Sequence, residues 1–303
     1  MATGLSLSTT SNLTSGQAIM IDRARVAFEP ASPEPETIAM KQLPTGHYQF
    51  SSNIYARLSN ADALTEGVDL SSVQQFVANN ITINPSEHGL LVTQSKRLRR
   101  RQGDSDAAST AGTLMGISIR ARQALDIHAV WDTFTLSTPG AASALDITEY
   151  RGSVAYLITD NSSAYGPAPM PLTSVLHAEQ ISDIILDISD PSTVTAGNSG
   201  TPTTRNGLSA EMLQRWWRGT DRLYGIPILH GGYIARDSDD DAKGAIYARD
   251  SMVMVEEGQA EATEEDDNSL RVIEMGLFKS WGETLQIDVH GVEIMSDAEA
   301  TVS

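Results

Sequence analysis

The stretch between residues 61 and 133 constrains the fold most, because it joins an extended polar arm to one unusually long helix. The arm covers residues 61–92 and carries strand-forming runs at residues 81–83 and 90–93, with few apolar side chains of its own. A turn at residues 84–89, which contain Pro and Gly, joins these two runs. Strands of this kind are not stable alone. We therefore expect another surface, and first of all a second copy of the chain, to cover the arm.

The helix that follows is predicted to run from about Asp104 to Thr133, a length of roughly 45 Å. Asp104 or Ser105 can cap its N-terminus. Small and apolar residues recur at spacings of three and four, and these are predicted to form its buried stripe: Ala111, Leu114, Met115, Ser118, Ala121, Leu125 and Ala129. Gly112 and Gly116 would let another backbone approach closely. A helix this long would act as a strut.

The remaining pattern predicts an α+β fold whose strands are scattered along the chain. Residues 1–15 form a Ser/Thr-rich arm, and the prolines of residues 29–36 predict an extended spacer. The predicted strands cover residues 47–58, 172–176, 228–230, 244–255, 270–278 and 285–295. The predicted helices begin at Asp146, with Tyr150, Val154, Leu157 and Ile158 as the buried stripe, at His177 and at Ser209. Loops or turns are expected at residues 139–140, 161–171, 192–207, 224–227 and 256–267.

Charge is segregated along the chain, which has 21 basic and 39 acidic residues and a net charge of −18. Such a chain is not a general nucleic-acid binder. The acidic loops are predicted to include Asp239, Asp240, Asp241, Glu264, Glu265, Asp266 and Asp267. A basic patch at the foot of the long helix contains Lys96, Arg97, Arg99, Arg100 and Arg101. This patch fits ion pairing with acidic loops of the same or a neighbouring chain, contact with DNA phosphates, or simple solvation.

No catalytic, metal or cofactor site is predicted. Gly197-Asn-Ser-Gly200 superficially resembles a serine-protease loop, but no histidine shares a matching local context with Ser199. His230-Gly-Gly232 fits a strand end followed by a turn better than an oxyanion motif, since no nucleophile elbow accompanies it. Residues 237–241 fit a solvated acidic turn, because Ala242 and Ala248 replace the glycine and glutamate of a calcium loop. Trp216-Trp217 is expected to anchor a core or an interface.

Composition excludes disulfides and thiolate metal sites, because the chain has no cysteine. We expect no membrane-spanning helix, because the chain has no run of 18 apolar residues. We also expect no signal peptide, because its first residues lack the basic and apolar regions of one.

Taken together, the order of these parts resembles the major capsid proteins of tailed double-stranded DNA bacteriophages, which share the HK97-like fold. Residues 63–70 and 89–93 are similar to that family's extended loop. Residues 171–184, 223–228 and 244–252 are similar to its axial domain, and residues 291–298 to its closing strand. The resemblance covers roughly residues 45–303 in the correct order.

The resemblance implies a set of structural regions in this chain. They are an N-terminal arm (1–46), an extended two-stranded loop with flanking strands (47–102), a spine helix of the peripheral domain (103–137), an axial domain (138–249), peripheral strands with an acidic loop (250–285) and a closing axial strand (286–303). The extended loop would contact a neighbouring subunit through Leu64, Glu66, Val68, Leu70 and Phe76. No lysine lies between Ser59 and Asn80, so we expect none of the covalent cross-links that a loop lysine forms in some family members.

The function implied is structural: the chain would assemble into hexamers and pentamers of an icosahedral head around double-stranded DNA. It would be made in the cytoplasm of a bacterial host and end in the virion. Its partners would be itself, portal and scaffolding proteins, cement or decoration proteins, and packaged DNA through weak non-specific contacts, with no membrane. An encapsulin-like nanocompartment shell is the alternative, and a serine hydrolase built on Ser199 is a distant one.

Overall fold

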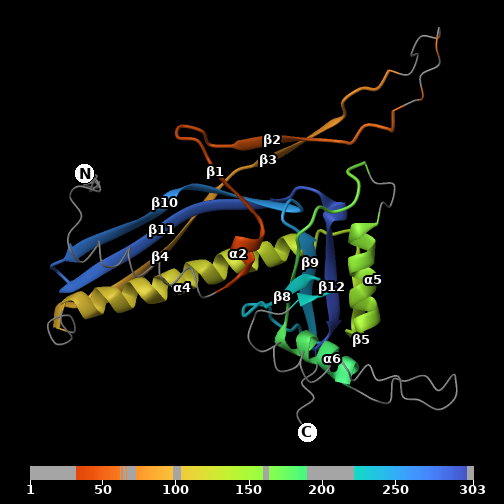
Figure 1. The fold of residues 1–303 in the computed structure, drawn as a ribbon. Coiled ribbons are helices and arrows are strands. Elements are labelled where there is room, and N and C mark those ends of the chain that lie inside the picture. Colours follow the sequence, from red (N-terminus) through yellow and green to blue (C-terminus); the bar gives the residue numbers. More distant parts are fainter. Residues whose placement is uncertain are drawn as a thin grey trace.

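The computed structural model describes residues 32–61, 63, 66, 73–97, 104–159, 164–189 and 222–298, and for residues 104–108, 142, 188 and 189 it describes the backbone alone. Within these residues, two sheets are joined by one long helix, and a two-stranded arm projects beyond them (Figure 1). The predicted N-terminal arm up to residue 31, the loop at 192–207 and the helix from Ser209 lie outside the described residues.

The first sheet has the strand order β1-β10-β11-β4 and lies along the long helix α4 (Figure 1). Its strands are β1 (Ala39–Gln42), β10 (Met252–Asp267), β11 (Val272–Leu285) and β4 (Ser86–Ser95). β10 and β11 form a long antiparallel hairpin, β4 adds to β11 antiparallel, and β1 adds to β10 parallel.

The acidic stretch at residues 256–267, expected to be a loop, is strand β10 instead. Beyond a bulge between Glu257 and Glu261, exposed Glu261, Thr263 and Glu265 alternate with half-buried residues on the other face. A strand tolerates many carboxylates when alternate positions face solvent. The strand expected at 270–278 is also longer, since β11 continues to Leu285.

Helix α4 (Asp104–Trp131) confirms the predicted start and nearly the predicted length, but its buried stripe was predicted correctly only in part. Ala111 and Met115 are buried, whereas Leu114, Ser118, Leu125 and Ala129 are exposed. The actual core face carries Ala111, Met115, Ile119, Ala124, Ile127, Val130 and Trp131. Apolar residues occur on two sides of this helix, so their spacing alone does not select the buried side.

The second sheet has the order β5-β12-β9-β6-β8-β7. Its strands are β5 (Ser137–Ala144), β12 (Gly291–Asp297), β9 (Asp241–Ala248), β6 (Leu172–Leu176), β8 (Ile226–His230) and β7 (Arg222–Leu223). The predicted strand at 172–176 is confirmed. The turn predicted at 224–227 is confined to Tyr224 and Gly225, both at positive φ, because Ile226 and Pro227 already belong to β8. The expected break at Pro139-Gly140 is a bulge inside β5, where the register against β12 shifts.

Strand β9 separates two cores. Ala245 and Tyr247 face the core that α4 shares with both sheets. Ile246 and Ala248 face a second core covered by α5 (Ile147–Ile158) and α6 (Ala178–Ser189). Asp146 caps α5 as predicted, its carboxylate accepting the Glu149 N–H at 2.7 Å. Of the stripe predicted for α5, Tyr150, Val154 and Leu157 are buried and Ile158 is exposed.

The arm that projects from the body, called the arm from here on, differs from the predicted one at residues 61–92. It contains β2 (Phe50–Tyr55) and β3 (Ala78–Ile83), which pair antiparallel. The two strand runs of the predicted arm therefore do not pair with each other: β3 pairs with β2, whereas β4 pairs with β11. Only Asn84 and Pro85 separate β3 from β4. The prolines at 33 and 35 begin the short helix α2 (Glu34–Thr37), not an extended spacer, and η4 (Asp288–His290) precedes β12.

A pair of glycine substitutions tests the packing between β12 and the segment after α4. A Cβ at Gly291 would lie 2.1 Å from the Phe134 ring, so Gly291→Ala should lower the free energy of unfolding by about 1–3 kcal/mol through overpacking. Gly152 on α5 has open space around its Cβ position, so Gly152→Ala should be neutral or stabilising by up to about 1 kcal/mol. Urea unfolding followed by circular dichroism measures both, and equal effects would contradict the packing described.

Candidate assembly surface

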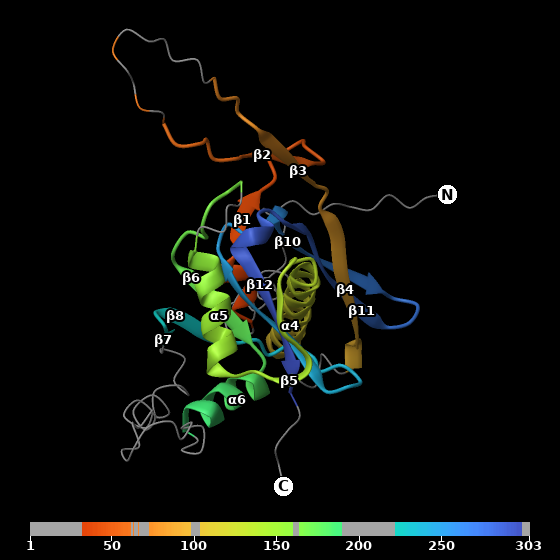
Figure 2. The ribbon, with the colours of Figure 1, turned by 90° about the vertical axis from the view of Figure 1, so that its right-hand side faces the viewer.

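The arm presents apolar side chains that this chain does not cover. Tyr55 is 60% exposed, Phe76 78% and Val73 85%, and the Tyr55 and Phe76 rings meet edge to face at 6.4 Å. The arm projects away from the body in both views (Figures 1 and 2). Of the residues predicted to contact a neighbour, Phe76 and Glu66 are exposed, whereas Leu64, Val68 and Leu70 lie outside the described part. Exposed apolar clusters of this kind are typical of interaction surfaces.

The root of the arm is fixed to the body. Ile54 and Ile83 are 7% and 4% exposed, and Ile83 packs with Leu43, Val253 and Val255. The Ala56 N–H donates to Val77 O at 2.9 Å. The Arg57 N–H donates to the carbonyl of Ala164 at 2.8 Å, which ties the arm to the loop before β6. The arm is therefore held at one end and open along the rest of its described length.

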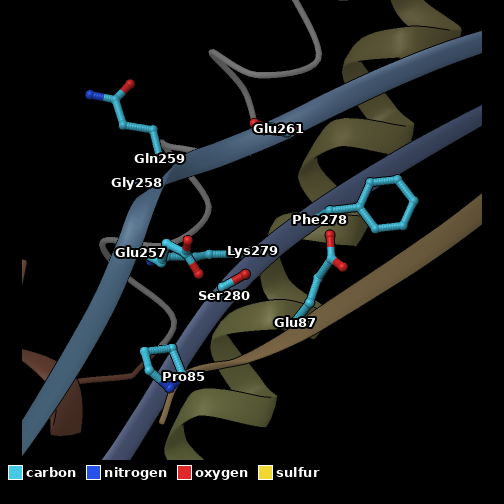
Figure 3. A pocket seen from close by; sticks show the side chains of 9 residues that line it. All are labelled: Pro85, Glu87, Glu257, Gly258, Gln259, Glu261, Phe278, Lys279 and Ser280. Carbon is cyan, nitrogen blue, oxygen red and sulfur yellow. The ribbon is translucent and has the colours of Figure 1, made fainter. Parts of the chain in front are cut away.

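The face of the first sheet turned away from α4, here called the outer face, is hollowed beside the β10 bulge. The hollow, called the notch below, encloses about 460 Å³. Its carboxylates are Glu87, Glu257 and Glu261, and the Phe278 ring reaches from β11 toward β4 beside Glu87 (Figure 3). The notch thus combines an aromatic ring with an acidic rim.

A buried charge network links the β10–β11 hairpin to α4. Lys279 Nζ donates to Glu256 Oε1 at 2.6 Å, and Gln123 Nε2 donates to the same oxygen at 3.1 Å. Glu256 is 7% exposed, so its charge depends on these partners.

The segment before β1 is held by a second buried network, which sequence patterns did not indicate. Glu34 is fully buried and lies 3.2 Å from His128 Nε2. Arg120 donates to the carbonyl of Ser32 and, at 2.9 Å, to Glu36. Burial lowers the pKa of Arg120, and the neighbouring glutamates oppose that shift. The partners are about 90 residues apart in the chain, so no local spacing could have revealed them.

Among the described residues, the basic patch contacts the β10–β11 hairpin of the same chain through Lys96. Lys96 Nζ lies 2.5 Å from Asp266 Oδ1 and donates to Asn268 at 2.7 Å. Arg97 is described, whereas Arg99, Arg100 and Arg101 lie outside the described residues. Hydrogen bonds from Ser269 and Leu270 lower the pKa of exposed Asp267. The role of the patch toward a neighbour or DNA stays a prediction.

Residues 237–240 form a turn organised by Asp237, whereas Asp241, predicted to lie in this acidic loop, is buried as the first residue of β9. Asp237 Oδ1 accepts the N–H groups of Asp239 at 2.9 Å and Asp241 at 3.0 Å, and Asp240 lies 3.5 Å from Arg236. Within the described ranges, no three His, Asp or Glu residues are grouped as metal ligands. Ser199 and Trp216-Trp217 are outside those ranges. No helix of the described part is long and apolar enough to cross a membrane.

Comparison with known proteins shows similarity in structure without similarity in sequence. No family model matches the chain, and no curated protein sequence matches it. A chain from the head structure of Helicobacter pylori bacteriophage KHP40 has a TM-score of 0.64 at 10% identity, covering 89% of this chain and 91% of that one. A chain from the capsid of cyanophage P-SCSP1u has a TM-score of 0.61 at 11% identity, covering 99% and 96%.

A chain from the capsid of Ralstonia phage GP4 agrees, with a TM-score of 0.62 at 12% identity and 88% coverage of both chains. This chain has a phage-capsid fold. The predicted capsid-like architecture is therefore confirmed as a mixed α/β fold rich in strands. The match to the cyanophage chain spans nearly the whole of both chains.

Removing one partner of the buried ion pair should destabilise the subunit. Lys279→Met leaves Glu256 buried and uncompensated, which should lower the free energy of unfolding by about 3 kcal/mol. Lys279→Met combined with Glu256→Gln removes the charge and keeps an acceptor for Gln123, so most of that loss should be recovered. Urea unfolding of both variants tests the pair; a double variant no more stable than the single one would contradict it.

Stability should also depend on pH through Glu283. Burial, and next the charge of Asp126, raise the pKa of Glu283 to about 7. A raised folded-state pKa means that stability is greatest below the unfolded value near 4.5 and declines as the pH rises toward 7. Glu283→Gln should therefore raise the free energy of unfolding at pH 8 by on the order of 1 kcal/mol, after allowance for partial exposure, and so raise Tm there, whereas it should change both little at pH 5. Calorimetry at pH 5 and pH 8 measures the effect. An equal change in Tm at the two pH values would refute the raised pKa of Glu283.

Proposed function

We propose that this chain is a major capsid protein that self-assembles into the hexamers and pentamers of an icosahedral phage head enclosing double-stranded DNA. The observation that carries the proposal is the arm: the strand pair β2–β3 and the segments beyond it, with strongly exposed Tyr55, Val73 and Phe76, project from a body with a phage-capsid fold. A subunit that leaves such a surface open is completed by association. Its role is structural, not enzymatic.

We further propose that the regions expected from sequence correspond to the two sheets. We assign α4 and the first sheet to the peripheral domain, and the second sheet with α5 and α6 to the axial domain. Strands β2 and β3 form the extended loop, and β12 is the closing strand of the axial domain. The sheet order supports this division, since β10 and β11 belong to the first sheet whereas β12 returns to the second.

The partners of such a subunit follow from its role. Its main partner is itself, and a head also requires portal and scaffolding proteins and can carry cement proteins. The net charge of −18 favours weak, non-specific contact with packaged DNA over tight binding. The particle would be made in the bacterial cytoplasm, and the mature location of the chain would be the virion. Many repeated weak contacts then stabilise the shell through multivalency.

Shortening the arm tests the proposed assembly. Replacing residues 58–75 by Asn-Gly keeps the Ala56–Val77 hydrogen bond and the β2–β3 ladder but removes the outer arm. The subunit should stay folded, with its unfolding free energy changed by less than about 1 kcal/mol, because the removed side chains contribute little to the core. Closed shells should disappear in negative-stain electron microscopy.

The Gly152→Ala variant serves as the control and should assemble like the wild-type chain. Normal shells from the shortened chain would show that the arm is not the assembly element. A wild-type chain that never forms shells under any assembly condition would reject the capsid function itself.

A further inference from the structure

The side of α4 turned away from its core face is apolar. Leu114 is 58% exposed, Ile117 37% and Leu125 44%, and Ala121 between them is half-buried. These four residues follow one another at spacings of three and four, so they lie in one row along the helix, called the α4 stripe below. The stripe is roughly 16 Å long. It is separate from the core of this helix, which uses the opposite side.

The α4 stripe lacks the charged residues that normally cover an exposed helix face. In a chain with 21 basic and 39 acidic residues, positions 109–121 hold only one charged residue, Arg120, and it is buried. The other exposed positions of this stretch are Thr110 and Ser118, which are small and uncharged. A helix that faces solvent usually carries charged or strongly polar residues on that side. The stripe therefore has the composition of a contact surface.

The described part of the chain begins beside this stripe. Arg120 Nε donates to the carbonyl of Ser32 at 3.2 Å, and His128 Nε2 lies 3.2 Å from Glu34 Oε1. From Glu34 back to Ser32, the contacts thus move along α4 from His128 toward its N-terminal half. Ile117 of the stripe is three residues, or about one helical turn, before Arg120. The residues that precede Ser32 in the sequence are therefore joined to the body next to the stripe.

Residues 17–28, which lie outside the described part, have an apolar pattern that matches the stripe. Their spacing predicts an amphipathic helix with Asp22, Arg23 and Arg25 away from its apolar side, followed by a break at Pro30. That apolar side would carry Met20, Ile21, Ala24, Ala27 and Phe28. Such a helix would be roughly 18 Å long, close to the length of the stripe. A helix this short is marginal alone in water, so it needs a surface.

We propose that the α4 stripe is the docking surface for residues 17–28 of the same chain, which pack on it as an amphipathic helix. The apolar side centred on Ala24 covers Leu114, Ile117, Ala121 and Leu125. The connection from Phe28 to Ser32 can span up to roughly 14 Å, which is enough to place the helix on the stripe. The inference concerns the single subunit and does not rest on the proposed function.

Charge and covalent connection favour this occupant over a second copy of the chain. Two subunits that each carry a net charge of −18 repel one another. Residues 17–28 contain two arginines and one aspartate, so their net charge is +1, and the rest of the chain attracts them. A segment joined to the body by a few residues also has an effective concentration in the millimolar range. The subunit can therefore cover its own stripe before it meets a neighbour.

Engineered cysteines test the docking in the full chain, which has no cysteine of its own. Leu114→Cys places a thiol on the stripe, and Leu91→Cys places one on β4 at a residue of nearly equal exposure, 57% against 58%. Maleimide labelling of dilute, unassembled subunits is followed by mass spectrometry. The thiol at position 114 should react at least tenfold more slowly, because residues 17–28 cover it. Equal rates at the two positions would overturn the proposal.

A matched pair of changes in the segment identifies the cover. Met20→Asp with Ala24→Asp puts two carboxylates on the proposed contact side and should raise the labelling rate at position 114 to that at position 91. Ile19→Asp with Val26→Asp makes the same change in charge on the opposite side and should leave the protection in place. Circular dichroism checks that each variant remains folded.

The remaining outcomes separate this segment from other occupants. Protection at position 114 that survives Met20→Asp with Ala24→Asp would show that another part of the molecule covers the stripe, and would overturn the proposal. Protection that appears only as the protein concentration rises would assign the stripe to a second copy instead. Electron microscopy of wild-type shells tests the capsid function separately, since failure to form shells leaves the labelling of the single subunit unchanged.

Discussion

The structure depends on a single helix face that two sheets share. Trp131 and Met115 of α4 are fully buried in a core that also contains Met254 and Leu277 of the first sheet and Tyr247 of the second. Without α4, the inner face of the first sheet would be exposed, and the second sheet would keep only its α5 and α6 side. Burying one helix stripe therefore fixes the relative position of both sheets, and with them the root of the arm.

Local signals in the sequence predicted the elements whose ends are set by local chemistry. Asp146 caps α5 through its own side chain, and Tyr224-Gly225 forms a turn between two short strands. The start of α4 and its length follow from an apolar pattern maintained over many turns. Because the capsid-like order of these elements was also visible, the architecture could be predicted although the matched structures share only 10–12% identity with the chain.

Burial and contacts that depend on residues far apart in the sequence could not be predicted in the same way. Leu114 and Met115 are equally apolar in sequence, and only the position of the sheets makes one exposed and the other buried. Glu34 contacts His128 of α4 far along the chain, so the proline-rich stretch that suggested a spacer is held against α4 instead. For the candidate site, sequence indicated the arm but not the notch, since Phe278 lies beside Glu87 and Glu261 only when strand pairing brings β4 and β10 to either side of β11.

The short link between β9 and β10 has a mechanical consequence. Only Arg249–Ser251 separate a strand of one sheet from a strand of the other, and the Ser251 carbonyl accepts the N–H groups of Gln286 and Ile287 on the returning chain. Tension applied to one sheet would thus pass along covalent backbone into its neighbour within three residues. Because α4 packs against both sheets, the subunit should resist bending between them. Any deformation of an assembly of such subunits would then concentrate at the contacts between subunits.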